Sequence, residues 1–320
     1  MVAPVNSSPT RYDDPLREAD SVERKPPTRT RDESSLFAQL PGPSGGISTS
    51  AVDAASPLTA AQVRDANVGG RLDALRDSYS GPYKVDGQTV TAPPMFRMNG
   101  GANHESAKVH DKELAKIASR VGVDIAGIRG GYGRPQDLVK VTQALIDAGK
   151  LPPPPGDVAS RIKAMQWEWG IGVDCACYTY RSVEAAHGKS GASQGLLTIG
   201  TEGFRNLDGN NSWKKVDPTL ARPGDVMTLD PTPPEKVGHN VIVRSHTMKG
   251  SLHTFEVDSA WGAGANGDVK GGYRRDTWTY DETTRLWSWT NHHVSPPVTE
   301  TSTEGPAERF HGCYRPKVSR

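Results

Sequence analysis

The chain has 320 residues, a formal net charge of +1 and an apolar content of 35%, with 34 glycines and 25 prolines. This length allows one large or two ordinary domains with a real core, but the low apolar content indicates that part of the chain is not packed. The near-zero charge provides no global field that would attract nucleic acid or an anionic membrane. No apolar run approaches the ~18 residues of a membrane span.

Residues 1–55 are rich in proline, serine, threonine and charged side chains. Such a segment cannot bury enough apolar surface to offset the entropy that it would lose on ordering. We predict a disordered tail, which is either a linker or an export signal for a specialised bacterial secretion system. The N-terminus shows no apolar signal-peptide core, so we expect secretion by such a system or a periplasmic location.

Residues 56–150 are expected to form a mainly helical domain of unassigned role. Apolar side chains recur at helical spacing in three stretches: 60–75, 110–121 and 136–148. An Asp-Gly turn within residues 85–90 predicts a short hairpin. The proline run that follows Leu151 is typical of a rigid spacer, so we place a linker at 151–156 and a second domain at 157–320.

The second domain begins with a helix that Asp157 caps, and a glycine-flanked turn then brings Cys175 to the start of another predicted helix. This helix should end near His187, with Gly188 as its left-handed cap. A thiol at a helix N-terminus lies at the positive end of the helix dipole, which favours its thiolate. The pattern therefore indicates Cys175 as a nucleophile.

The neighbouring Cys177 points about 200° away from Cys175 on an ideal helix, so only one of the two thiols can face a given cleft. The alternative interpretation is that both cysteines are buried thiols with a purely structural role. Zinc binding is disfavoured because no second ligand pair at zinc spacing appears. With three cysteines in the chain and no disulfide pattern, the composition suits synthesis in a reducing compartment.

Three polar or aromatic residues precede the thiol, namely Asp174, Trp167 and Trp169. We take them as candidate substrate-binding residues beside the nucleophile. The alternative for the two tryptophans is that they fill a core.

After Pro223 the chain alternates between short strands and turns. A turn that leads into a strand is predicted at 220–229, and further strands are predicted at 238–245, 252–259, 271–280, 284–291 and 310–315, with a long polar loop at 291–308. One helix followed by five or six antiparallel strands indicates an α+β fold. His239 begins one strand and Asp258 lies near the end of the next, so the imidazole is the candidate base for Cys175 and Asp258 the group that orients it.

Several motifs, in this order, resemble those of the NlpC-like cysteine peptidases, which share the papain-like fold with the CHAP amidases. Residues 174–177, Asp-Cys-Ala-Cys, stand where that family has Asp-Cys-Ser-Gly. Residues 222–226, Arg-Pro-Gly-Asp-Val, match its strand lead-in, and residues 238–243, Gly-His-Asn-Val-Ile-Val, match its Gly-His-Val-Gly-Ile-type strand. Residues 312–316, Gly-Cys-Tyr-Arg-Pro, are similar to its last strand. The resemblance covers about residues 157–317.

The resemblance implies a papain-like core in which an N-terminal helix packs on an antiparallel sheet. It implies Cys175 as nucleophile, His239 as base and Asp258 as the third polar residue, with an oxyanion pocket partly formed by the Cys175 backbone N–H. The chain also departs from the family. Ala-Cys follows the nucleophile in place of Ser-Gly, tryptophans stand where a tyrosine is common, and the third position is an aspartate where the family more often has His, Asn or Gln.

The resulting hypothesis is a bacterial cysteine hydrolase, delivered as an effector or acting at the cell wall, that cleaves amide bonds in peptidoglycan stem peptides. A Cys-His-Asp order also occurs in transglutaminases, so acyl transfer, deamidation or proteolysis of a target protein is an open alternative. A non-catalytic binding module is a second one. The expected partner is a peptidoglycan peptide or a target protein, with an immunity protein or a secretion chaperone as further candidates. We expect a monomer with no nucleic-acid partner, no membrane span, no metal and no cofactor.

Overall fold

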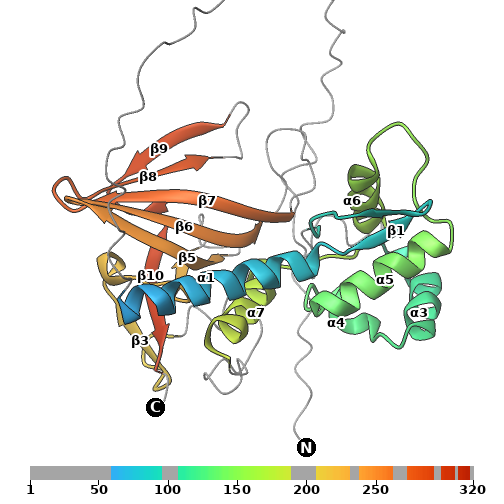
Figure 1. Ribbon diagram of the computed structural model, residues 1–320, viewed down its shortest axis with the longest axis horizontal. Coiled ribbons are helices and arrows are strands. Elements are labelled where there is room, and N and C mark those ends of the chain that lie inside the picture. The colour runs from blue at the N-terminus through green and yellow to red at the C-terminus, as the bar shows by residue number, and fades with distance from the viewer. Residues whose placement is uncertain are drawn as a thin grey trace, which may run out of the picture. The chain divides into compact units, whose positions relative to one another are not determined.

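The computed structural model describes residues 59–95, 107–188, 207–230, 238–261, 272–291, 297–306 and 309–317. In these ranges the chain folds as the predicted α+β arrangement, with helices packed on an antiparallel sheet (Figure 1). The tail predicted at residues 1–55 lies outside the described residues. None of the helices described has the combination of length and apolarity that crossing a membrane requires.

The described helices are α1 (Ala60–Tyr79), α3 (Asp111–Arg120), α4 (Ile125–Arg129), α5 (Pro135–Asp147), α6 (Val158–Glu168) and α7 (Cys175–His187). Most of their boundaries follow from local chemistry. Pro135 occupies the first turn of α5, where its missing N–H costs nothing. Asp157 caps α6, as predicted, by accepting the N–H of Ser160 at 2.9 Å.

The strands form a hairpin and a large sheet. The hairpin joins β1 (Tyr83–Val85) to β2 (Gln88–Val90). The sheet contains β3 (Trp213–Val216), β4 (Val226–Leu229), β5 (His239–Lys249), β6 (Leu252–Trp261), β7 (Gly272–Asp281), β8 (Leu286–Asn291), β9 (Val298–Ser302) and β10 (Phe310–Pro316). Their order is β3-β10-β4-β5-β6-β7-β8-β9, and each strand is antiparallel to its neighbours.

The prediction of a loop at residues 291–308 was wrong, because β9 runs through it. Its Val-Thr-Glu-Thr-Ser sequence has no apolar alternation, since β9 is an edge strand whose side chains are exposed or half-buried. The opposite edge strand, β3, was not predicted either. An edge strand needs only one hydrogen-bonded neighbour and little apolar surface, so a hydrophobic pattern does not reveal it.

The large sheet separates two hydrophobic clusters. On what we call the helix face, Val226, Ile242 and Ala260 pack with the apolar faces of the helices. On the far face, Val241 and Val257 pack with tryptophans of β7 and β8. Because side chains alternate along a strand, neighbouring residues of β5 or β6 point to opposite faces. This alternation determines which polar side chains can meet.

The helices before and after residues 151–156 share one core, which contains Leu138, Met165 and Tyr178. The spacer itself is tied to its neighbours, since Arg161 Nε donates to the Pro152 carbonyl at 2.6 Å. Residues 58–320 form one compact unit. The predicted domain boundary at 151–156 is therefore corrected: the prolines stiffen a turn, but the apolar faces of α5 and α6 decide the packing.

Candidate active site

Cys175 is the first residue of α7, as the sequence predicted. Gly188 ends this helix in the left-handed conformation, with φ at 64°. Along its length α7 packs against α1, β5 and β6, and Figure 1 shows it beside the long α1 helix. The thiol is thereby held at the dipole-positive end of a 13-residue helix.

The helical region fixes the backbone that leads into Cys175. The N–H of Val173 donates to the Met95 carbonyl at 2.9 Å, and the N–H of Asp174 donates to the Gly131 carbonyl at 3.2 Å. Val173 also forms an isolated β-bridge with Tyr132. Residues 56–150, to which the sequence assigned no role, thus position the start of α7.

Asp174 is the N-cap of α7, and its carboxylate accepts the N–H of Cys177. The side chain is buried, with 7% of its surface exposed. Burial raises the pKa of this carboxyl to about 7, against the lowering effect of the backbone N–H groups of Cys177 and Ala176. The predicted substrate-binding role is therefore corrected to a capping role, because the carboxylate is already engaged by the helix.

The raised pKa of Asp174 predicts a pH-dependent stability. The unfolded carboxyl titrates near pH 4, so between about pH 4 and 7 the folded chain keeps a proton that the unfolded chain loses, and stability falls as the pH rises. Asp174→Asn keeps a good N-cap and removes this titration. In urea unfolding, the variant should gain on the order of 1–2 kcal/mol relative to wild type at pH 8 and change little at pH 4. A variant less stable than wild type by the same amount at both pH values would contradict the assignment.

The two cysteines of α7 point to different surroundings, as their helical spacing predicts. Cys177 is fully buried in the core between the helices, near Tyr79 and Arg181. Burial raises the pKa of the Cys177 thiol to about 12 and that of Cys313 well above its ordinary value. Cys175 has 5% of its surface exposed. Neither Cys177 nor Cys313 is suited to form a thiolate near neutral pH.

The two tryptophans before the thiol differ. Trp169 is buried in the core, with its ring stacked on His110 at 4.3 Å between centroids and the Lys150 ammonium 5.6 Å from the ring centroid. A substrate-binding role for Trp169 is therefore corrected to a packing role. Trp167 is half-buried on α6, so of the two it alone has surface left for a ligand.

His239 begins β5, as predicted, and is buried with 6% of its surface exposed. It pairs with Leu229 on β4, a residue of the far face. Its ring packs on Trp261, with centroids 3.5 Å apart. Strand alternation therefore places the imidazole on the far face, whereas the next residue, Asn240, lies on the helix face with Ile242.

His239 nevertheless lies toward the end of the sheet where α7 begins. Tyr178, in the first turn of α7, contacts Tyr273 at the start of β7. The last residue of α7, His187, hydrogen-bonds the Gly224 carbonyl at 3.1 Å, and the Gly224 N–H donates to the Val243 carbonyl. The helix thus runs from the His239 end of β5 toward Val243.

Asp258 does not join His239. It pairs with Ile242 across the strands, so its side chain lies on the helix face. There its carboxylate accepts two hydrogen bonds from Arg275, at 2.8 and 3.0 Å. The prediction that Asp258 orients the imidazole is corrected, because one strand register cannot put His239 and Asp258 on the same face.

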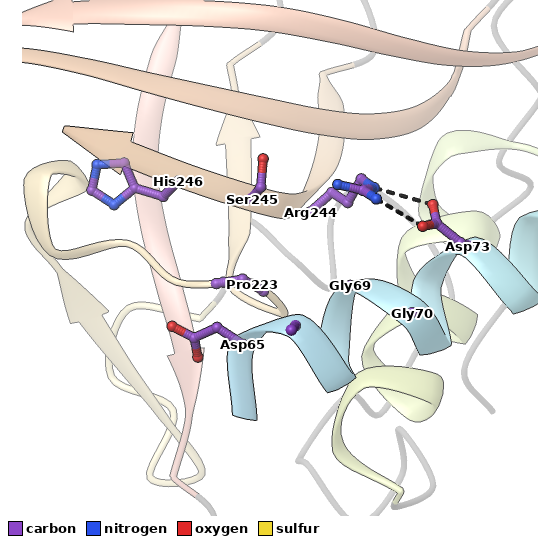
Figure 2. A pocket seen from close by; sticks show the side chains of 9 residues that line it. Asp65, Gly69, Gly70, Asp73, Pro223, Arg244, Ser245 and His246 are labelled. Atoms are coloured by element: carbon purple, nitrogen blue, oxygen red, sulfur yellow. Dashed lines mark hydrogen bonds and ion pairs between the residues drawn. The ribbon is translucent and has the colours of Figure 1, made fainter. Parts of the chain in front are cut away.

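The Arg275–Asp258 pair belongs to a network that ties α1 to the sheet. Arg275 also donates to Asp73 of α1 at 2.6 Å, and Asp73 binds Arg244 of β5 at 2.7 and 3.1 Å. Figure 2 shows Arg244 and Asp73 facing each other beside the hollow between α1 and β5. Hydrogen bonds from Arg244 and Arg275 hold the pKa of the Asp73 carboxyl well below its ordinary value.

Sequence reasoning missed two buried polar residues near this end of the sheet. Asn240 is fully buried on the helix face, and its amide group has no hydrogen-bond partner within the described ranges. Asp276 pairs with Val257 and so lies on the far face, where burial raises its pKa to about 7 and Trp261 lies beside it. Asp276, rather than Asp258, is thus a buried carboxyl on the face of His239. No motif marks Asp276, and the motif at residues 238–243 contains Asn240 without assigning it a role.

The comparisons with known proteins name no relative. No protein-family model matches the chain, and no curated protein and no solved structure is significantly similar to it. In the part of the chain that the structure describes, no group of three His, Cys, Asp or Glu side chains is arranged to hold a metal ion.

Proposed function

We propose that the protein is a cysteine-dependent hydrolase of amide bonds, with Cys175 as its nucleophile and peptidoglycan stem peptides as its substrate class. The observation that carries the proposal is the position of Cys175 at the first residue of α7, with the preceding backbone fixed by Met95 and Gly131. The helix dipole favours a thiolate at that position. The substrate class rests on the resemblance of the motifs to NlpC-like peptidases.

In the proposed reaction, His239 takes the proton of the Cys175 thiol, and the thiolate attacks the carbonyl carbon of the scissile amide. The oxyanion that forms is stabilised by the Cys175 backbone N–H. The imidazolium then protonates the leaving amine, which leaves a thioester on Cys175. Water, deprotonated by the same imidazole, hydrolyses the thioester and restores the thiol.

We assign the base to His239 because it is the first residue of β5, at the end of the sheet where α7 begins. Asp258 takes no part, since its carboxylate is committed to Arg275. Asp276 is the buried carboxyl on the face of His239, and we assign it the orienting role that the sequence predicted for Asp258. Asp174 is the competing base, because it adjoins the nucleophile and its pKa is about 7.

A second candidate function, a non-catalytic binding module, is favoured by one observation. His239 packs on Trp261 on the far face, while α7 packs against the helix face. In this second function, His239 serves the packing of the far face, Cys175 is a structural residue of α7, and the cleft only binds. The reactivity of the thiol separates the two functions.

We expect iodoacetamide to alkylate Cys175 at least ~10-fold faster than Cys177 and Cys313 at pH 7, because only the thiolate reacts and burial raises the pKa of the other two thiols. Peptide mass spectrometry over a time course gives the rate at each cysteine of the native protein. Labelling in urea is the control that shows all three thiols to be detectable. Equal slow rates in the native protein would exclude the hydrolase and support the binding module.

A further inference from the structure

A second cavity lies at the opposite end of α7 from Cys175. It has a volume of about 310 Å³. Its charged or titratable lining residues come from α1, the turn before β4, β10 and the last turn of α7, and include Arg64, Arg71, Arg222, Arg315, Asp225 and His187. Asp65 and Pro223 line both this cavity and the hollow drawn in Figure 2.

Two of these arginines are held rigidly by the fold. Arg71 donates through Nε and Nη2 to the carbonyls of Ala185 and Ala186, the last turn of α7. Arg315 binds both carboxylate oxygens of Asp225, at 2.8 and 2.6 Å, through Nε and Nη2. Each guanidinium is thus fixed along one edge, and its Nη1 stays outside those bonds. A guanidinium held in this way loses little entropy when it binds a ligand.

The other two arginines are exposed. Arg222 makes no side-chain hydrogen bond or ion pair with the described residues, and Arg64 meets only the neighbouring Asp65, at 3.3 Å. Burial lowers the pKa of His187, which keeps its imidazole neutral at pH 7. The cavity is therefore lined by four arginines and by two carboxylates, those of Asp65 and Asp225, so its lining carries an excess of positive charge.

We infer that this cavity binds the phosphate group of a small ligand. A phosphate monoester carries roughly −1.5 to −2 charges at pH 7. This charge complements Arg71 and Arg222, which form no ion pair with a carboxylate of the described residues. The planar guanidinium fork binds phosphate oxygens through paired hydrogen bonds. The cavity is larger than a phosphate ion, so it also has room for part of the group that the phosphate esterifies. This site is separate from the proposed hydrolase site.

The test uses the full-length protein and two probes, inorganic phosphate and glycerol phosphate, at pH 7.5. Calorimetric titration gives the dissociation constants, and thermal unfolding gives the shift in Tm, each against potassium chloride of equal ionic strength. We compare wild type with the double variant Arg64→Gln/Arg222→Gln. Arg120→Gln is the matched control, because Arg120 is an exposed helix residue that does not line the cavity.

Wild type and Arg120→Gln should bind both probes saturably, and glycerol phosphate should bind more tightly. The double variant should bind at least ~10-fold more weakly, with an unchanged Tm in chloride because both replaced side chains are exposed. An equal response of wild type to phosphate and chloride would overturn the inference. So would a double variant that binds the probes as tightly as wild type.

Discussion

Replacing Asp258 with alanine should lower the free energy of unfolding by about 3 kcal/mol, since it leaves the half-buried Arg275 without its main partner. Asp258 is fully buried and accepts both hydrogen bonds of the Arg275 fork. The loss is expected at the lower end of the range for broken buried pairs, because Arg275 keeps its contact with Asp73. Urea unfolding at pH 7 measures the change.

A double-variant cycle tests whether Asp258 acts through Arg275. Asp258→Asn combined with Arg275→Met should destabilise the protein by less than the sum of the two single variants, because no charge is left uncompensated. Under the corrected assignment, activity should follow the folded fraction in all three variants. If Asp258→Asn unfolds at the wild-type urea concentration yet loses most of its activity, Asp258 serves the catalytic base and the assignment to the network is wrong.

The largest expected effect on activity is that of Cys175→Ala, which should reduce amide hydrolysis by roughly 10³-fold or more, because no other group supplies the nucleophile. Cys177→Ala is the matched control on the same helix. It should stay within a few-fold of wild-type activity and lose about 1 kcal/mol of stability from the small cavity that it leaves. Rates of muropeptide release, corrected for the folded fraction, give the comparison.

The identity of the base follows from two further variants. His239→Gln should lower the rate by roughly 10²-fold to 10⁴-fold, whereas Asp174→Asn, which keeps the cap, should retain most of it. The reverse pattern would transfer the role of base to Asp174. If Cys177→Ala inactivates the protein and Cys175→Ala does not, the proposed nucleophile is wrong by two residues.

The local features of the site were predictable because they depend on short-range chemistry. An aspartate before a helical run and a glycine after it placed both ends of α7, so the position of Cys175 followed from residues 174–188 alone. The Asp86-Gly87 turn of the β1–β2 hairpin was equally readable, since both residues adopt positive φ there. Local rules of this kind need no knowledge of the rest of the fold.

The separation of His239 from Asp258 was not predictable, because it depends on the register between β5 and β6. That register shifts between Val243 and Ser245, and the strand alternation that results sends His239 to the far face and Asp258 to the helix face. A shift of one residue exchanges the two faces of a strand, and no motif encodes it. The hydrophobic pattern of the sequence likewise did not predict β9, because an edge strand can be polar on both faces.

The measurement that tests the proposed function most directly is mass spectrometry of fragments that the purified full-length protein releases from isolated peptidoglycan sacculi, with Cys175→Ala run in parallel. If Cys175 is the nucleophile of an amide hydrolase, new stem-peptide fragments should appear with wild type and with Cys177→Ala, and none with Cys175→Ala. The masses would then identify the scissile bond. Identical profiles for wild type and Cys175→Ala would contradict the proposed hydrolase.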